Sequence, residues 1–280
     1  MIFDPSKPPL TDSAGLLKSI PVEAEPEIWK RATKVISSGL CDLQVNGFAG
    51  VDYNDPTLMP EEFEKSLFTM LSTGVTTCLP TVITGSEDWQ IQCFHALEEG
   101  RNASKLAQTM IPGYHLEGPF LNPEEGFCGC HPSKWMRPAT WDHFERLQEA
   151  AGGRIKLITV APEIKGVLDL IPKLVEKGIA VAIGHCNPDH DTLLRAADAG
   201  VTLSTHLGNG IAQILPKKDN PILGQLAEDR FSASFIADGV HQQPHVLRVY
   251  LRAKQSSRTI LVTDGTSCSA ALPGRYSLGQ

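Results

Sequence analysis

The sequence lacks the features that point to nucleic acids or membranes. Its 280 residues carry a formal net charge of −7 and a pI near 5.7, so there is no basic excess to match a phosphate backbone. It contains no run of about 18 consecutive apolar residues that could span a bilayer. We therefore expect neither a nucleic-acid partner nor a membrane partner.

Signals for secretion and for disulfide bonding are also missing. The N-terminal stretch MIFDPSKPPLTDSAG has neither the basic segment nor the apolar core of a signal peptide. The seven cysteines are odd in number and show no CxxC spacing, which favours reduced thiols. With 41% hydrophobic and 20% charged residues, the chain is expected to be a globular, cytoplasmic protein with a substantial core.

What the sequence does contain is a repeated alternation of strand and helix patterns. Apolar runs rich in β-branched residues recur eight times, at 39–47, 74–84, 110–119, 155–163, 179–187, 201–209, 231–241 and 258–267. Helical periodicity is clear at 60–74, 140–152, 167–178 and 188–200. Apolar strands joined by helices predict a covered parallel sheet, and eight of them favour a (β/α)8 TIM barrel over a doubly wound open sheet.

The barrel pattern does not extend over the whole chain. Residues 1–38 show no series of strands, and we interpret them as an irregular N-terminal lead-in with at most a short helix near Glu25 to Lys34. The barrel domain is assigned to 39–280. The closing stretch SCSAALPGRYSLGQ is too short and too interrupted by glycine and proline to form the eighth barrel helix. We expect that helix to be largely missing.

Polar residues stand at the ends of the predicted strands, where the active site of such a barrel is built. They are Gln44, Asn46, Glu117, His185, His206, Asp238, His241 and Asp264. A single histidine at such a place is more often structural. Glutamate, two histidines and aspartate from four strand ends, however, converge on one mouth. Two neutral imidazoles and a carboxylate fill three of the four positions of a divalent metal such as zinc.

Six segments carry a resemblance to a known family: DLQVNGFAGVDYND, HLEGPFLN, GHCN, THLGNG, IADGVH and LVTDGTS. In this order and spacing, the chain resembles the N-acetylglucosamine-6-phosphate deacetylases of the amidohydrolase superfamily. The resemblance implies a metal held by Glu117, His185 and His206, with Asp264 as the catalytic carboxylate. It also implies a small β-sandwich domain and a further substrate loop, which we expect to be largely missing here.

The end of the first strand bears on the number of metal ions. Most amidohydrolases carry His-x-His there for a second metal, whereas this sequence has Gln44, Val45 and Asn46. An amide is a poor zinc ligand beside an imidazole. We therefore expect one divalent ion, zinc, with iron, cobalt or manganese as alternatives. Gln44 and Asn46 either form structural hydrogen bonds or contact substrate or water at the second-metal position.

Substrate recognition is implied by residue-by-residue resemblance. His241 matches a histidine that faces the substrate, which implies a catalytic role as a donor to the amide carbonyl or a role in orienting the sugar, although it could instead cap its own loop. Cys130 and His131 in GCHP, and Asn209 and Gly210 in THLGNG, match phosphate-contacting positions. The usual arginine past the asparagine has no clear equivalent, because only the lysines of GNGIAQILPKKDN follow. Lysine lacks the bidentate fork of arginine, so the 6-phosphate is an open question.

The expected activity is hydrolysis of the acetamide of an N-acetylated amino sugar, most simply N-acetylglucosamine 6-phosphate to glucosamine 6-phosphate and acetate. The metal would activate water, and Asp264 would accept its proton and return it to the amine. The alternatives are a shortened or inactive relative that binds metal or sugar without turnover, and an amidohydrolase of another amide. Glu117 in HLEGP argues against a cyclic-amide hydrolase or deaminase of the same superfamily, in which a carboxylated lysine is usual at the bridging position. The resemblance also implies a dimer, so a homodimer is one expected state.

Overall fold

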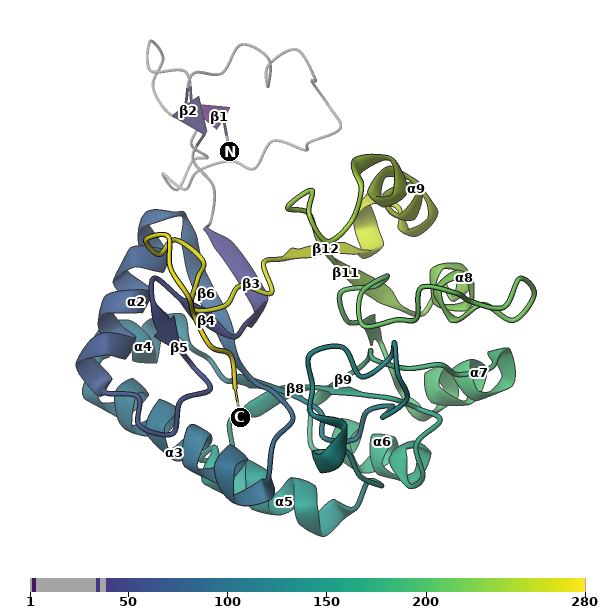
Figure 1. Cartoon of the computed structure of the whole chain (residues 1–280), viewed down its shortest axis with the longest axis horizontal. Helices are drawn as coiled ribbons and strands as arrows, with labels where there is room; N and C mark the ends of the chain where they lie inside the picture. Colours follow the sequence, from purple (N-terminus) through teal and green to yellow (C-terminus); the bar gives the residue numbers. More distant parts are fainter. Residues whose placement is uncertain (1, 4–33, 36–38, 280) are drawn as a thin grey trace, which may run out of the picture.

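The computed structural model describes residues 2–3, 34–35 and 39–279. Its centre is a parallel sheet of eight strands in the order β3, β6, β7, β8, β9, β10, β11, β12 (Figure 1). The strands are β3 Leu40–Val45, β6 Val75–Val82, β7 Tyr114–Glu117, β8 Ile155–Val160, β9 Ala180–Ile183, β10 Leu203–Ser204, β11 Ser232–Ile236 and β12 Thr259–Val262. Each predicted run contains one of them, so the predicted strand series is confirmed.

The two edge strands of this sheet meet, and the sheet closes into a barrel. Val45 forms a parallel bridge with Gly265. The Asn46 N–H donates to the Gly265 carbonyl at 2.7 Å, and the Asp264 N–H donates to the Gln44 carbonyl at 3.0 Å. The chain just beyond β12 therefore pairs with the end of β3, which excludes the open-sheet alternative.

A buried carboxylate reinforces this closure. Asp42 of β3 is 4% exposed. Its Oδ2 accepts a hydrogen bond from Thr263 Oγ1 at 2.5 Å, and its Oδ1 accepts one from the Thr263 N–H at 3.2 Å. Regular strand pairing is sparse here, so the side chain supplies hydrogen bonds that the backbone ladder does not. We call the contact between β3 and residues 263–265 the seam.

The helices lie outside the strands, with α9 next to the last two strands (Figure 1). They are α2 Pro60–Ser72, α3 Glu87–Ala103, α4 Lys105–Met110, α5 Trp141–Ala150, α6 Val167–Glu176, α7 His190–Ala199, α8 Pro221–Ala227 and α9 Pro244–Lys254, with 3-10 turns η1 Ser133–Trp135 and η2 Ser256–Arg258. The four predicted helices are all present. Among the described residues after β12 there is no helix, as expected.

Local signals explain the helix ends. The side chains of Ser86, Thr140 and Asp189 each accept a hydrogen bond from the first turn of α3, α5 and α7, which satisfies donors that a helix leaves free. Gly200 ends α7 with φ 116°, a conformation that costs glycine little. These caps fix where α3, α5 and α7 begin and where α7 ends.

The main core lies between the sheet and the helices. Buried side chains of the helices, such as Phe63, Phe94, Phe144 and Ile171, pack there with the outward-facing residues of the strands. The barrel interior holds a smaller apolar cluster of Leu79, Leu157, Ala182 and Leu203. Leu79, Leu157 and Leu203 each stand two residues before a threonine. Side chains two residues apart share one face of a strand, so these threonines also point into the barrel. An apolar layer thus supports a polar layer nearer the mouth.

The remaining elements are short. β4 Gly47–Phe48 and β5 Val51–Asp52 form an antiparallel pair after β3, and β1 Ile2–Phe3 pairs with β2 Lys34–Val35. The irregular lead-in predicted for 1–38, and the short helix within it, fall mostly outside the described residues. None of the described helices is both long and apolar enough to cross a membrane.

Candidate metal and catalytic site

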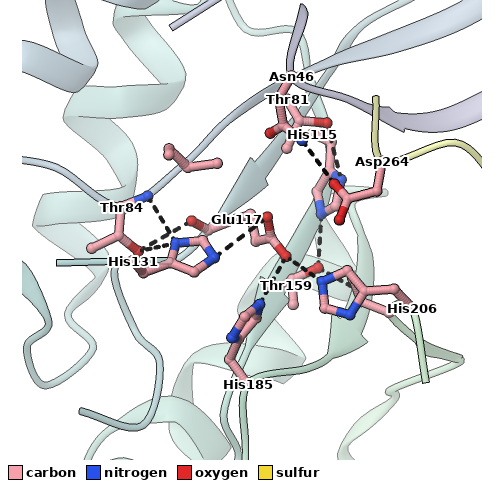
Figure 2. Close-up of polar contacts among 12 residues, drawn as sticks. Asn46, Thr81, Thr84, His115, Glu117, His131, Thr159, His185, His206 and Asp264 are labelled. Atoms are coloured by element: carbon pink, nitrogen blue, oxygen red, sulfur yellow. Dashed lines mark hydrogen bonds and ion pairs between the residues drawn. The ribbon is translucent and has the colours of Figure 1, made fainter. Parts of the chain in front are cut away.

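The site is centred on Glu117, the last residue of β7, which is 2% exposed. Figure 2 shows His131, His185 and His206 pointing toward its carboxylate. Glu117 Oε1 lies 2.8 Å from His206 Nε2 and 3.5 Å from His185 Nε2. The potential ligand atoms of Glu117, His185 and His206 all lie within 4.8 Å of one another. The structure therefore brings together the three residues predicted to hold a metal.

Three site residues have an unusual backbone. His185, His206 and Asp264 have φ values of 50°, 30° and 48°, in the left-handed region that non-glycine residues seldom adopt. Each follows the end of its strand by two residues. Such conformations cost about 1–3 kcal/mol each and persist where the surrounding structure holds them, often at functional sites.

The His185 ring is held from several sides. Its Nδ1–H donates to the Phe127 carbonyl at 2.8 Å, which leaves the lone pair of Nε2 directed toward Glu117 and free to bind a metal. A Cβ on Gly129 or Gly210 would lie 2.8 or 2.4 Å from His185 Cε1, closer than real contacts allow. Gly210, predicted as a substrate contact, thus lies with its backbone against the ring of His185, a predicted metal ligand.

His206 is held less completely. Its main-chain N–H donates to Ser234 Oγ at 2.7 Å, but its ring Nδ1 is buried without a hydrogen-bond partner among the described residues. Burial alone would lower the pKa of His206, but the hydrogen bond and negative charge of Glu117 outweigh it and raise the pKa to about 9. A divalent ion at Nε2 would replace that proton.

Glu117 is ionised despite its burial. Desolvation opposes the charge, yet His131, His185 and His206 hold the pKa of Glu117 well below its usual range. His131 Nε2 lies 3.6 Å from Glu117 Oε2, and His131 Nδ1 lies 3.1 Å from Thr84 Oγ1. Burial lowers the pKa of His131 to about 3, so this ring is neutral at pH 7. The predicted substrate residue His131 lies buried beside the carboxylate.

Asp264 lies at the same mouth as Glu117, across the site from His131 and on the side of His206 (Figure 2). Asn46 Nδ2 donates to its Oδ1 at 2.7 Å. Burial raises the pKa of Asp264, while His206 opposes the shift and the charge of Glu117 adds to it. A raised pKa suits a carboxyl group that must both accept and donate a proton near neutral pH. Gln44 Nε2 and Asn46 Oδ1 are buried without partners among the described residues.

A polar layer that sequence reasoning missed lies beneath Glu117. His115 precedes Glu117 by two residues on β7, and its Nε2 lies 2.7 Å from Thr159 Oγ1. Thr159 Oγ1 is in turn 2.7 Å from Thr205 Oγ1, and His115 Nδ1 is 3.4 Å from Thr81 Oγ1. Burial lowers the pKa of His115 to about 4. The signal was available, because residues two apart on a strand share a face.

The other predicted substrate residues lie around the mouth. His241 is 46% exposed, and its Nδ1 lies 2.7 Å from Asp238 Oδ2, so its ring is directed at its own turn and not at Glu117. Asn209 Nδ2 donates to the His206 carbonyl at 3.1 Å. Cys130 is exposed. The structure thus brings the predicted metal residues and Asp264 together, whereas the ring of His241 pairs with Asp238.

The donor set fits one divalent ion. A carboxylate and two imidazoles are the ligands that zinc and similar metals take, with a further position left open. All three side chains are buried, and the Phe127 carbonyl fixes the tautomer of His185. A cation would also compensate the buried charge of Glu117, which an unpaired carboxylate could not sustain cheaply.

Comparison with known proteins supports this geometry. No family model matches the chain. It is 33% identical over 255 residues to the N-acetylglucosamine-6-phosphate deacetylase of Bacillus subtilis (strain 168), covering 90% of this chain and 63% of that protein. It is 32% identical over 260 residues to the Bos taurus enzyme of the same name, with 88% and 61% covered. The chain is a homologue of these deacetylases. It spans 61–63% of the length of these curated relatives.

Solved structures of such deacetylases share the fold. A mutant of the Mycobacterium smegmatis enzyme in complex with N-acetyl-D-glucosamine-6-phosphate matches with a TM-score of 0.78 and 28% identity, covering 86% of this chain and 61% of that one. The Pasteurella multocida enzyme matches with a TM-score of 0.75 and 29% identity, covering 91% and 65%. The resemblance inferred from the motifs and the barrel inferred from the strand and helix pattern are thereby confirmed. A relative from Shewanella sp. (strain ANA-3), 32% identical over 259 residues with 90% of this chain and 63% of that protein covered, is named for N-acetylgalactosamine-6-phosphate.

Proposed function

We propose that this chain carries the metal-binding and catalytic part of a deacetylase that converts N-acetylglucosamine 6-phosphate into glucosamine 6-phosphate and acetate. The observation that carries the proposal is the buried cluster of Glu117, His185 and His206 with Asp264 at the same mouth. The names of the relatives, and the bound sugar phosphate in one solved neighbour, support the substrate class. We expect the reaction to take place in the cytoplasm.

In this proposal Glu117, His185 and His206 hold one zinc ion, with iron, cobalt or manganese as alternatives. When bound, the ion supplies Lewis-acid activation of water and of the amide carbonyl. Asp264 takes the proton of the attacking water at Oδ2, because Oδ1 is occupied by the Asn46 amide. It then gives that proton to the departing nitrogen, since an amine leaves only once it is protonated.

The sugar phosphate is proposed to contact Cys130, Asn209 and His241 at the mouth. His241 would need to leave Asp238, or bind through its free Nε2, to reach the sugar. His131 and Gly210 lie against Glu117 and His185, so they would act on the substrate from beside the metal ligands. Gln44 and Asn46 would orient Asp264 and water. A homodimer is part of the same proposal.

The decisive experiment combines metal analysis with acetate release on one preparation. We expect one zinc per chain and acetate from N-acetylglucosamine 6-phosphate, with slower release from the unphosphorylated sugar. Asp264→Asn should bind zinc normally and lose about 10²–10⁴-fold in rate, the range attributed to proton transfer by a positioned side chain. Stoichiometric metal without acetate from any N-acetylhexosamine would instead indicate a binding protein without turnover.

A further inference from the structure

A carboxylate outside the cluster connects three loops of the mouth. Glu163 follows β8, which lies between β7 and β9 in the sheet. Its Oε1 accepts hydrogen bonds from the Asn187 N–H at 2.6 Å and from Asn122 Nδ2 at 3.0 Å. Asn122 belongs to the loop after β7, and Asn187 belongs to the loop after β9. The middle strand thus ties the loops of its two neighbours, which carry Glu117 and His185.

A series of hydrogen bonds connects Asn122 with the His185 ring. Asn122 Oδ1 accepts from the Glu124 N–H at 2.9 Å, and the Glu124 carbonyl accepts from the Phe127 N–H at 3.0 Å. These two turns present the Phe127 carbonyl, which accepts from His185 Nδ1 at 2.8 Å. The orientation of Asn122 therefore decides where the group that fixes the His185 tautomer lies.

The same carboxylate also holds the His185 main chain. The Asn187 N–H that it accepts lies two residues past His185, and the Asn122 N–H donates to the His185 carbonyl at 3.1 Å. His185 has φ 50°, a conformation that needs outside support. Both routes from Glu163 therefore end at His185, one at its ring and one at its backbone.

We propose that Glu163 is a positioning residue that holds His185 in its metal-binding orientation through Asn122 and Asn187. This inference rests on the proposed function, because it assigns His185 to a metal. Glu163 has no contact with Glu117, His206 or Asp264 among the contacts of the described residues, so its effect is indirect. Residues that orient a metal ligand typically change metal affinity by about 10–100-fold when they are removed.

The test is the zinc affinity of the full chain, measured by competition with a chromogenic chelator. Glu163→Ala should weaken zinc binding by about 10–100-fold. Glu163→Gln retains an oxygen acceptor for the Asn187 N–H and should stay within about threefold of the parent, because the hydrogen bond survives without its charge. The visible spectrum of bound Co²⁺ gives a second readout, since a displaced imidazole changes the ligand field in Glu163→Ala.

The matched control is Glu98→Ala, which removes a similar tie from the opposite end of the same strands. Glu98 accepts hydrogen bonds from Tyr114 OH and from Arg154 Nη1, each at 2.6 Å. Tyr114 begins β7, and Arg154 precedes β8. Loss of Glu98 should lower the unfolding temperature and leave the zinc affinity unchanged. An equal loss of zinc affinity in both variants would reduce the effect to general destabilisation and overturn the proposal.

Asn122→Ala provides an independent variant on the same route. It should weaken zinc binding to a similar extent, and the double variant with Glu163→Ala should not add the two losses, because coupled residues are not additive. If Glu163→Ala does not fold, Asn122→Ala decides alone. Folded variants that bind zinc as the parent does would overturn the proposal.

The two proposals fail in different ways. Zinc binding by the parent without acetate release contradicts the deacetylase function and leaves the role of Glu163 standing. Absence of zinc binding by the parent overturns both.

Discussion

The two sides of the mouth are built differently. On the β9 side, the His185 ring donates to the Phe127 carbonyl and lies against Gly129 and Gly210, and Glu163 accepts hydrogen bonds from Asn122 and Asn187 in the loops on either side of it. On the side of β10 to β12, His206 has a ring nitrogen without a partner among the described residues, and His241 is 46% exposed. The structure thus fixes the His185 ring by several contacts, whereas under the proposed function an ion and a substrate would complete the order of the other side. Preset ligands of this kind raise affinity by reducing the cost of ordering on binding.

The largest effect is expected from the residue that both sides share. Glu117→Gln removes the carboxylate that faces His185 and His206, and it should weaken zinc binding by more than the roughly 100-fold typical of orienting residues. At zinc concentrations about 100 times its dissociation constant, the parent should gain about 2.7 kcal/mol of stability from the metal. Thermal unfolding with zinc and with a chelator measures both. The same zinc-dependent shift in parent and variant would contradict the assignment of Glu117.

The seam should matter for the fold more than for the metal. Asp42→Ala removes the acceptor of two hydrogen bonds from Thr263 and one from the Gln44 N–H. Bonds to charged groups contribute about 1.5–3 kcal/mol each, but the variant also relieves the desolvation cost of the buried carboxylate, which offsets part of that sum. We expect a loss of about 2–3 kcal/mol in urea unfolding, with zinc affinity nearly unchanged. Asp198→Ala, on the surface, is the control and should stay within about 0.5 kcal/mol of the parent. A tenfold loss of zinc affinity in Asp42→Ala would show that the seam also supports the metal-binding arrangement of His185 on the β9 side.

A smaller effect is expected at Gly210, a proposed substrate contact whose backbone lies against the ring of His185. Gly210→Ala places a methyl group 2.4 Å from the His185 ring and should weaken zinc binding by about tenfold, equivalent to 1.4 kcal/mol. Gly239→Ala carries the same kind of backbone penalty, since its φ is 77°, but its Cβ would meet nothing within 4 Å. Chelator competition on the two variants separates ring displacement from backbone strain. Equal losses would remove the special role of Gly210.

The smallest effect is expected at the exposed pair of Asp238 and His241 on the side of β10 to β12, where the contribution to stability depends on pH. Burial opposes ionisation of Asp238, but hydrogen bonds from the main chain and ring of His241 lower its pKa to about 2. The ordinary value for aspartate is about 3.9, so the turn contributes stability above about pH 4 that is lost as the pH falls toward 2. The pair is exposed, and its contribution should stay below about 1 kcal/mol. Urea unfolding should separate the parent from Asp238→Asn at pH 6 and less so at pH 3. A difference that grows at low pH would contradict the shift.

The fold, and the meeting of Glu117, His185 and His206 at one place, were predictable from the sequence for a physical reason. Eight apolar runs joined by helices leave few arrangements, and parallel strands place all their carboxyl ends at one mouth. Glu117, His185 and His206 therefore had to meet. Loop residues carry no such constraint. The contact of buried His131 with Thr84 joins two loops that are far apart in the sequence, and the direction of His241 toward Asp238 depends on a hydrogen bond within a turn that has no periodicity.

The supporting residues were hidden for another reason. Glu163 and Asn122 are ordinary polar residues in sequence, and only the adjacency of β7, β8 and β9 joins them to His185. His115 differs, because its spacing from Glu117 placed it on the inner face of β7 in advance. Strand order thus reveals the positioning residues, and the strand period reveals the inner layer.

The most direct test of the proposed metal-dependent deacetylase activity is a zinc titration of metal-free protein, followed by acetate release from N-acetylglucosamine 6-phosphate. The rate should rise linearly with added zinc and level off at one ion per chain, and Glu117→Gln should remain inactive throughout. Full activity in the presence of a strong chelator, or no acetate at any zinc ratio, would contradict the assignment.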